Sequence, residues 1–488
     1  MNLMVQGTAS YSGKSFLAMA LCRVFADKGY KVAPFKAQNT SLNSFVTRDG
    51  KEISRAQALQ ALAAGIEPTP EMNPILVKPK GDSTSQVVVN GSPYIEIDAR
   101  DYYEKFALKE GLEIVGDALE TLQREYELII IEGAGSPAEI NLYHCDIANM
   151  RIADMADAEV ILIADIDRGG VFASIYGTVE LLKPEHKHRV KGVVINKFRG
   201  DVNILNPGLE MIENKTHIPV LGVIPYITDL ELPGEDSLSL EEHSANNGVD
   251  IAVIRLPRIS NFTDFDPLAY DGARVRYVAE ASELGRPEGI IIPGTKNTME
   301  DLKWLREKGF ADKLKSLAGT IPIIGICGGY QILGKRIIDN GIEGNGELEG
   351  LGLLDVETRF EEYRKVTKQV EGKVLADYGF LRAAAGESVA GYEIHMGKTI
   401  LGSNAQPLLD LSGRVDGAMN REGTVFGTYL HGIFDSPGFR KAFFAGLDSG
   451  KTAPRDVDVR DAWLKSITRA ASTVSESIEI DMIEGWLM

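Results

Sequence analysis

Cysteine, basic residues and long apolar runs are all scarce in this sequence of 488 residues. Cys22, Cys145 and Cys327 are too few for a disulfide framework and lack the paired spacing of a zinc site, so we expect a reducing compartment. Lysine and arginine number 52 against 70 aspartate and glutamate residues, which gives a net charge of −18. A chain this acidic repels phosphates, so we expect neither nucleic acid nor a membrane surface as its partner.

The longest apolar runs, such as 128–131 and 160–164, are far too short to cross a bilayer. The first seven residues lack the basic region and long apolar core of a signal peptide, so we expect a cytoplasmic protein. Hydrophobic residues make up 44% and charged residues 25% of the sequence, as in ordinary globular proteins. These values exclude disordered, collagen-like and coiled-coil classes.

Short runs rich in valine and isoleucine alternate with helical patterns along the chain. The expected strands form a first set at 3–6, 32–35, 128–131, 160–164, 193–195 and 220–224, and a second set at 251–254, 290–292, 321–326 and 424–430. Strands that alternate with helices form mostly parallel sheets that are covered on both faces. We therefore predict an α/β protein with two doubly wound, mostly parallel-sheet domains.

An acidic stretch without lysine or arginine separates the two sets of strands, and Pro233 and Gly234 add turn residues to it. Both features are typical of a linker between domains. We therefore predict the following division of the chain: a first domain at 1–235, an acidic linker at 236–249, a second domain at 250–448 and a C-terminal extension at 449–488. The extension is charged and helical in pattern, and we expect it to pack on one of the domains.

The first expected strand leads into a glycine-rich loop that ends in Gly-Lys-Ser at the start of a helix. Such a loop turns its amide N–H groups toward phosphate oxygens, and the helix N-terminus adds partial positive charge. Lys14 would reach the β- and γ-phosphates of ATP, and Ser15 would bind Mg²⁺. The loop has five residues between its first and last glycines, one more than the standard P-loop. The predicted ATP site consists of Gly7, Thr8, Ser10, Gly13, Lys14 and Ser15.

A P-loop also needs an acidic residue at a strand end to hold its metal ion. Glu132 directly follows the apolar run 128–131 and precedes glycines that permit close approach. Asp165 and Asp167 follow the next expected strand and are weaker candidates. We therefore predict Ser15 and Glu132 as the protein ligands of Mg²⁺.

Polar residues follow the expected strand at 32–35, where ligands bind at the carboxyl edge of a parallel sheet. Lys36 would neutralise a phosphate or a substrate carboxylate. The neutral side chains that follow it would add hydrogen bonds to a substrate, and they are Gln38, Asn39, Ser41 and Asn43.

The second set of strands contains the pattern Gly-x-Cys-x-Gly around Cys327, which is the cysteine form of a nucleophile elbow. The tight turn would lift the sulfur above the sheet edge, and the following helix N-terminus would stabilise its thiolate. The amide of Gly328 would form an oxyanion hole, with a second donor from Gly294 or Thr295.

A thiolate nucleophile needs a proton partner, and His431 lies at the end of an apolar strand more than a hundred residues later. His395 is the rival candidate for this role. Phosphorylation by a P-loop activates a carboxylate, and a Cys–His pair can release ammonia from an amide through a thioester. Together the two sites indicate an amidation that takes its nitrogen from glutamine.

These motifs closely resemble those of the cobyric acid synthase family over nearly the whole chain. The segments that carry the resemblance are 7–15, PFKAQN at 34–39, EGAG at 132–135, DIANM at 146–150, DIDRGG at 165–170, NKFRG at 196–200, GICGGYQ at 325–331 and YLHG at 429–432. The first domain is similar to the dethiobiotin-synthetase-like branch of P-loop proteins, in which the extra loop residue is normal. The second is similar to class I glutamine amidotransferase domains.

The resemblance implies ATP- and glutamine-dependent amidation of a corrinoid, adenosylcobyrinic acid a,c-diamide, at its b, d, e and g carboxylates. It also implies that Cys327 and His431 form the glutaminase pair and that Asp146 affects substrate handling. Many amidotransferases carry glutamate two residues after the histidine, where this chain has Ile433, so the third member is absent or supplied elsewhere, with Glu393 as a guess. The Asp-x-His-x-x-Gly pattern of cobalt-ligating proteins is missing, so no bond between protein and cobalt is expected.

Two alternatives remain open at this point. A sister enzyme, cobyrinic acid a,c-diamide synthase, shares both domains and acts on the a and c carboxylates. A non-enzymatic nucleotide switch with an inactive amidotransferase domain is the alternative from another class, and the intact Cys327 and His431 argue against it. The oligomeric state, the ammonia route and the order of amidations are not predicted.

Overall fold

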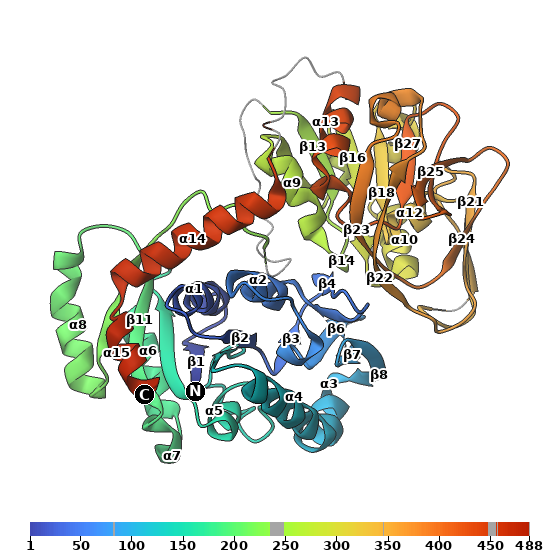
Figure 1. Ribbon diagram of the computed structural model, residues 1–488. Helices are drawn as coiled ribbons and strands as arrows, with labels where there is room; N and C mark the ends of the chain where they lie inside the picture. Colours follow the sequence, from blue (N-terminus) through green and yellow to red (C-terminus); the bar gives the residue numbers. More distant parts are fainter. Residues whose placement is uncertain (82, 235–247, 345, 448–454, 456, 488) are drawn as a thin grey trace.

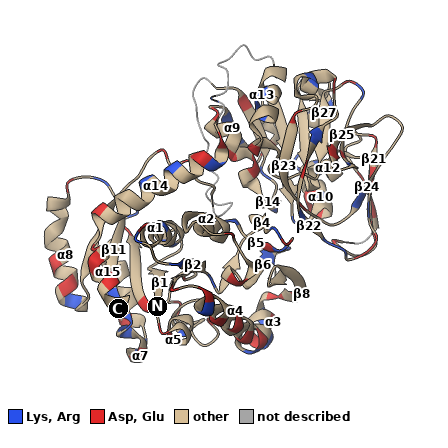
Figure 2. Cartoon of the chain, viewed as in Figure 1, with Lys and Arg blue, Asp and Glu red and all other residues tan. Residues whose placement is uncertain are grey.

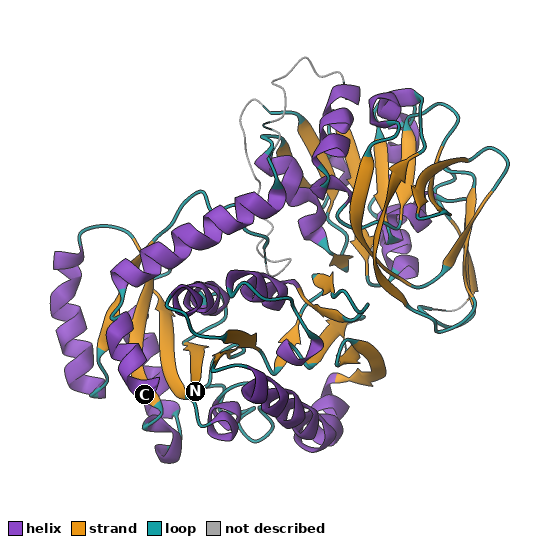
Figure 3. Cartoon of the chain, in the orientation of Figure 1, coloured by secondary structure: helices purple, strands orange, loops and turns teal. Residues whose placement is uncertain are grey.

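The computed structural model describes residues 1–81, 83–234, 248–344, 346–447, 455 and 457–487. It contains one large sheet in the residues up to 234, here called the first half, and another in residues 248–447, the second half (Figure 1). Helices cover both sheets (Figure 3). The predicted α/β class with mostly parallel sheets is therefore confirmed.

The sheet of the first half has six strands, all parallel, in the order β12-β11-β10-β1-β9-β2. Each contains one of the apolar runs expected from the sequence. Their bounds are β1 (Asn2–Gly7), β2 (Val32–Phe35), β9 (Leu128–Glu132), β10 (Glu159–Asp165), β11 (Val190–Phe198) and β12 (Val220–Pro225). The helices between them are α1 (Lys14–Asp27), α2 (Arg55–Ala63), α4 (Leu112–Glu125), α5 (Met150–Ala156), α6 (Val171–Leu181), α7 (Pro184–Lys187) and α8 (Val202–Thr216).

Alternate residues of these strands enter two different cores. Leu3 and Val5 of β1 pack with α1 on one face, whereas Met4 packs with α4, α5 and α6 on the other. Because side chains alternate along a strand, a strand buried on both faces is apolar at every position. This explains why the sequence shows continuous apolar runs here.

A smaller layer lies between β2 and α4, where the sequence patterns predicted no strands. It contains the sheet β3-β6-β7-β8 and the hairpin β4-β5. The bounds are β3 (Gln38–Thr40), β4 (Ser44–Val46), β5 (Glu52–Ser54), β6 (Ile75–Pro79), β7 (Thr84–Val89) and β8 (Ser92–Asp98), followed by α3 (Ala99–Asp101) and a π-helical segment at Tyr102–Gly111. Figure 1 shows that this layer faces the second half of the chain.

The second half is built on a nine-stranded sheet in the order β15-β13-β16-β18-β27-β26-β25-β22-β23. Its first five strands are parallel and the last four are joined antiparallel. The parallel strands are β13 (Asp250–Ile254), β15 (Arg274–Val278), β16 (Gly289–Ile292), β18 (Ile323–Ile326) and β27 (Val425–Thr428), and the antiparallel ones are β22 (Val366–Val374), β23 (Ser388–His395), β25 (Gln406–Leu411) and β26 (Arg414–Met419).

Short strands and helices complete the second half. The strands are β14 (Ile259–Ser260), β17 (Gly294–Thr295), β19 (Arg336–Asp339), β20 (Gly346–Glu349), β21 (Val356–Phe360) and β24 (Lys398–Leu401). The helices are α9 (Asp266–Tyr270), α10 (Thr298–Glu307), α11 (Phe310–Leu317), α12 (Gly328–Leu333) and α13 (Pro437–Gly446).

The C-terminal helices α14 (Val459–Ser477) and α15 (Ile480–Leu487) pack on the first half, beside α1 and strand β12. The amide of Glu479 donates to the carbonyl of Leu221 in β12 at 2.9 Å. A Cβ atom on Gly222 would lie 1.9 Å from the carbonyl oxygen of Ser477, so only glycine permits this approach. The chain therefore returns to its first sheet after completing the second. Most of the predicted linker, 236–247, and residues 448–454 and 456 lie outside the described residues.

The apolar face of α14 predicts a measurable contribution to stability. Ile467 is fully buried in the core that α14 shares with α1. Its replacement by alanine leaves a cavity and is expected to lower the free energy of unfolding by about 2–5 kcal/mol. Thermal unfolding of Ile467→Ala measures this loss, and Thr468→Ala, on the exposed face of the same helix, is the matched control. Equal melting temperatures for the two variants would show that α14 does not hold the first half together.

No helix among the described residues is long and apolar enough to cross a membrane. Acidic and basic residues are interspersed over both halves (Figure 2).

Candidate active sites

The predicted P-loop connects β1 to α1 at the carboxyl edge of the first sheet. Gly13 caps α1 with φ 107°, a left-handed conformation that favours glycine, and a Cβ atom there would lie 2.1 Å from the side-chain nitrogen of Asn196. The ammonium of Lys14 donates to the carbonyls of Ala9 at 3.0 Å and Gly135 at 2.9 Å. These bonds hold the lysine over the loop, where a phosphate would compete for it.

The carboxylate of Glu132 ends strand β9 and is almost fully buried. Its Oε1 accepts from the hydroxyl of Ser15 and from the ammonium of Lys36, both at 2.7 Å. Its Oε2 accepts from the amides of Gln57 at 3.3 Å and Gln60 at 2.5 Å. The structure therefore brings together the two predicted metal ligands and the predicted Lys36. The two glutamines are additions that no sequence motif indicated.

A cavity of about 500 Å³, here called the nucleotide-side cavity, lies against the predicted P-loop. Of the predicted ATP site, the residues that line it are Ser10, Gly13, Lys14 and Ser15. Of the other predicted residues, those that line it are Lys36, Gln38, Asn39 and Glu132. The amide of Thr8 bonds instead to the carbonyl of Ile163 at 3.0 Å, and Gly7 ends the strand.

The weaker metal candidates are engaged with cations. Asp165 accepts from the ammonium of Lys197 at 2.7 Å, and Asp167 accepts from the guanidinium of Arg199 at 3.2 Å. Glu132, by contrast, accepts from the hydroxyl of Ser15.

Asp146 does not line the cavity, and neither do Ser41 and Asn43, unlike the predicted substrate residues Lys36, Gln38 and Asn39. Its carboxylate accepts from the amide of Ala148 at 2.7 Å, and burial raises its pKa. Asn149 in the same motif donates to the carbonyl of Ala134 at 2.8 Å and accepts from its amide at 3.2 Å. Through these two hydrogen bonds, the motif at 146–150 holds the loop that follows Glu132 in place.

In the second half, Cys327 occupies the sharp turn between β18 and α12, with φ 52° and ψ −107°. A residue other than glycine in such a conformation stores strain of about 1–3 kcal/mol, which is typical of functional sites. Gly329 permits the turn, because a Cβ atom there would lie 1.9 Å from the carbonyl oxygen of Ile292. The sulfur of Cys327 lies 3.7 Å from the carbonyl oxygen of Ile394. The residue as a whole is 7% exposed.

His431 is fully buried next to this sulfur, and its Nδ1 lies 2.6 Å from Oδ2 of Asp264. The amide of Gly432 donates to the other oxygen of that carboxylate at 3.1 Å. Burial lowers the pKa of His431, but Asp264 and the interaction with Cys327 outweigh burial and raise it to about 10. The ring of Tyr392 stacks on the imidazole. Cys327, His431 and Asp264 are thus arranged as the nucleophile, base and orienting carboxylate of a triad would be.

The guess that Glu393 orients the histidine is wrong. Its carboxylate accepts from Arg414 at 2.5 Å and lies 3.1 Å from Lys368, on the other face of β23 from Tyr392. Because side chains alternate along a strand, Tyr392 and Glu393 cannot both face His431.

The rival histidine, His395, stacks on Tyr429 with ring centres 3.7 Å apart. Its two ring nitrogens are buried and have no hydrogen-bond partner among the described residues, and Nε2 lies 3.7 Å from Oε1 of Glu393, which is longer than a hydrogen bond. It borders the same cavity as Cys327, but the carboxylate that would orient a catalytic base contacts His431.

The two predicted oxyanion donors lie close together. A Cβ atom on Gly328 would lie 3.1 Å from the amide nitrogen of Thr295, and one on Gly294 would lie 3.1 Å from Cε1 of His431. Gly328 and Thr295 also line a cavity of about 50 Å³ that reaches Cys327. The turn and strand β17 therefore meet beside the sulfur.

Helix α2 of the first half connects the two sites. Arg55 lines the nucleotide-side cavity, and its guanidinium donates to the hydroxyl of Tyr392 at 3.0 Å, whose ring stacks on His431. Two residues later, Gln57 reaches Glu132. One short helix thus contacts residues of both sites.

Asparagine in place of Asp264 is expected to slow glutamine hydrolysis by about 10²- to 10⁴-fold, because the base loses its orientation and its charge partner. The raised pKa means that the imidazolium is lost only as pH rises through about 10. Removing the carboxylate lowers that pKa, so the fall in activity moves to lower pH.

The pH profile of glutamate release measures both effects in Asp264→Asn. Asp266→Asn is the matched control, because burial raises the pKa of that neighbouring carboxyl group well above its usual value. An unchanged profile in Asp264→Asn would remove Asp264 from the triad.

Each half of the chain matches a known protein family. Residues 3–240 match the family model described as CobQ/CobB/MinD/ParA nucleotide binding domain. Residues 250–439 match the model described as CobB/CobQ-like glutamine amidotransferase domain. Fold and sites thus define a glutamine amidotransferase joined to a nucleotide-binding domain.

Relatives of known family are similar over almost the whole chain. Cobyric acid synthase of Dehalococcoides mccartyi is 51% identical over 99% of this chain and 97% of the relative. Probable cobyric acid synthase of Methanococcoides burtonii is 53% identical over 91% of this chain and 89% of the relative. The chain belongs to the cobyric acid synthase family of cobalamin biosynthesis. It is therefore a glutamine-dependent carbon–nitrogen ligase, and its nucleotide-binding domain implies the use of ATP.

Proposed function

We propose that the protein converts adenosylcobyrinic acid a,c-diamide to adenosylcobyric acid by amidating its b, d, e and g carboxylates. ATP activates each carboxylate as an acyl phosphate, and glutamine supplies ammonia. The observation that carries this proposal is the presence in one molecule of the Cys327–His431–Asp264 triad and the cavity beside Lys14 and Glu132. We also propose the domain division at 1–235, 236–249, 250–448 and 449–488.

In the first half, Lys14 and the loop amides of the predicted ATP site bind the phosphates. A substrate carboxylate oxygen attacks the γ-phosphorus, the bond to the β,γ-bridging oxygen breaks, and ADP leaves. Lys36, Gln38 and Asn39 border the same cavity and hold the substrate carboxylate beside the γ-phosphate. Asp146 acts indirectly, through the loop that it supports.

The residues present fit a magnesium ion. Ser15 and Glu132 offer a hydroxyl and a carboxylate 2.7 Å apart, and Mg²⁺ prefers such oxygen ligands together with phosphates and water. Among the described residues no group of three or more His, Cys, Asp or Glu forms a metal site, so the nucleotide would supply the other ligands. The ion would neutralise charge on the β- and γ-phosphates.

In the second half, the sulfur of Cys327 attacks the side-chain amide carbon of glutamine. The oxyanion forms beside Gly328 and Gly294, and His431 gives its proton to the departing nitrogen. Ammonia leaves, and water hydrolyses the γ-glutamyl thioester to glutamate. Ammonia then attacks the acyl phosphate, which releases phosphate and leaves the amide.

The assay uses the purified protein with ATP, glutamine and adenosylcobyrinic acid a,c-diamide. Mass spectrometry of the corrinoid is expected to show four successive amides, with one ADP and one glutamate released for each. Amidation of cobyrinic acid at its a and c positions instead would establish the sister activity. Failure of both substrates in the presence of ATP and glutamine would contradict the proposal.

A further inference from the structure

The cavity at Cys327 is lined by an unusual concentration of charged side chains. Three lysines and one glutamate border it, and they are Lys78, Lys296, Lys365 and Glu343. Lys78 comes from strand β6 of the first half, so both halves of the chain form this wall. The catalytic steps described above use none of the four.

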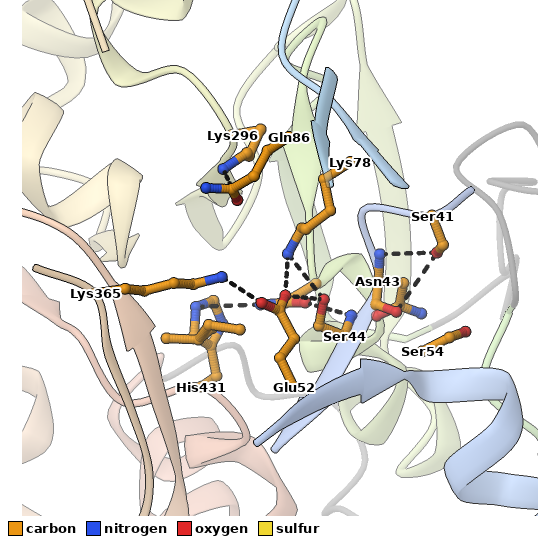
Figure 4. Close-up of polar contacts among 12 residues, drawn as sticks. Ser41, Asn43, Ser44, Glu52, Ser54, Lys78, Gln86, Lys296, Lys365 and His431 are labelled. Atoms are coloured by element: carbon orange, nitrogen blue, oxygen red, sulfur yellow. Dashed lines mark hydrogen bonds and ion pairs between the residues drawn. The ribbon is translucent and has the colours of Figure 1, made fainter. Parts of the chain in front are cut away.

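Two of the lysines share one buried carboxylate as their ion-pair partner. The carboxylate of Glu52, in β5, forms ion pairs with Lys78 and Lys365 and accepts from the hydroxyl of Ser44 at 2.7 Å (Figure 4). Burial alone would raise the pKa of Glu52, but the two ammonium groups hold it well below its usual value. Glu52 therefore stays charged and fixes both lysines across the interface.

Lys296 lies outside that ion-pair cluster. Among the described residues, the hydrogen-bond partner of its ammonium is the amide oxygen of Gln86, at 2.8 Å (Figure 4). Burial and the ammonium groups of Lys365 and Lys78 lower the pKa of Lys296 to about 7. The carboxylates of Glu52 and Glu343 act in the opposite direction and raise this pKa, but they do not offset burial and the two ammonium groups. An added anion would therefore stabilise the charged form of Lys296.

Glu343 borders the same cavity and accepts from the amide of Thr298 at 2.7 Å. Burial raises the pKa of Glu343 to about 7, although the hydrogen bond from Thr298 and the ammonium of Lys296 act in the opposite direction. The wall of the cavity thus offers both a cationic and an anionic group beside a nucleophile. That pair of charges is complementary to the carboxylate and ammonium of an α-amino acid.

We propose that Lys296 binds the α-carboxylate of glutamine and Glu343 its α-ammonium, while the side-chain amide reaches Cys327. The assignment rests on the proposed glutaminase activity of this cavity. Gln86 and the Glu52–Lys78–Lys365 cluster position Lys296, so the first half completes the binding site for the nitrogen donor. Glutamine is larger than the cavity of about 50 Å³, so its binding requires side chains of the cavity wall to move.

The test measures binding without turnover, in a Cys327→Ala background, by titration calorimetry. Three ligands are compared: glutamine, 4-aminobutanamide, which lacks the α-carboxylate, and glutaramate, which lacks the α-amino group. Lys296→Met is expected to weaken the binding of glutamine and glutaramate by about 10- to 100-fold and to change that of 4-aminobutanamide less than threefold. Glu343→Gln should weaken glutamine and 4-aminobutanamide and spare glutaramate.

Lys303→Met is the matched control, because Lys303 lies on the exposed side of α10 and pairs with Glu300. Amidation from ammonium salt by Lys296→Met with Cys327 intact reports that the variant is folded. Equal weakening of all three ligands, or no weakening of any, would overturn the assignment.

Failure of the proposed function gives a different result from failure of this assignment. If the wild-type protein released no glutamate from glutamine, the glutaminase proposal would fail whatever the variants bind. If it released glutamate and the ligand pattern were absent, only the roles of Lys296 and Glu343 would fail.

Discussion

Alanine in place of Cys327 is expected to abolish amidation from glutamine and to leave amidation from ammonium salts intact. The sulfur is the only atom of the triad that bonds to glutamine in the proposed mechanism, so its loss should cost on the order of 10⁴-fold in glutamate release. The first half is expected to keep its activity, because Cys327 lies in the second half and does not border the nucleotide-side cavity.

The measurement compares product formation with glutamine and with an ammonium salt at alkaline pH, where free ammonia is available. Cys145→Ala is the matched control, because Cys145 is a buried cysteine of the first half. Glutamate release by Cys327→Ala at the wild-type rate would mean that another group is the nucleophile.

Methionine in place of Lys14 should have the complementary result, with amidation lost from both nitrogen sources. Its ammonium is held over the loop by the carbonyls of Ala9 and Gly135, where it can stabilise charge on the transferring phosphoryl group. Removing one such group costs about 10²- to 10³-fold in rate. Covalent trapping of Cys327 by a glutamine analogue should remain.

Lys28→Met is the control for this variant, since Lys28 follows the same helix and pairs with Glu484 on the surface. A melting temperature for each variant separates loss of chemistry from loss of folding. Amidation by Lys14→Met at the wild-type rate would show that the P-loop lysine does not contact the transferring phosphoryl group.

The parts of the structure that depend on contiguous motifs could be predicted from the sequence. The strand–loop–helix around Lys14 and the turn around Cys327 depend on neighbours within a few residues, so glycine spacing and apolar runs were sufficient. Glu132 was found because it directly ends an apolar strand. The structure places these side chains where the motifs indicated.

The partner of His431 could not be found in this way. Asp264 lies 167 positions earlier in the chain, and only the fold brings it within 2.6 Å of the imidazole. Four of the six residues at 261–266 are polar or acidic and are interspersed with phenylalanines. Such a pattern indicates buried polar groups that have partners, but it does not say which partners. The guess at Glu393 was wrong because its neighbour in β23, Tyr392, faces His431. Consecutive residues of a strand face opposite sides of the sheet.

Contacts between the two halves could not be predicted from the sequence either. Glu52 and Lys365 lie 313 positions apart, and neither belongs to a recognisable motif. The amphipathic pattern of α14 predicted a helix but not that it returns to the first sheet. The antiparallel strands β22, β23, β25 and β26 were missed because polar residues interrupt their apolar runs.

The central claim is that phosphate from ATP activates the carboxylate that ammonia then attacks. Substrate labelled with ¹⁸O in its reacting carboxylates tests it, with glutamine and ATP present and the label followed by mass spectrometry of inorganic phosphate. The account predicts one ¹⁸O atom in phosphate for each amide formed, because the acyl phosphate carries the carboxylate oxygen away. Label found in AMP, or amides formed with no label in phosphate, would contradict it.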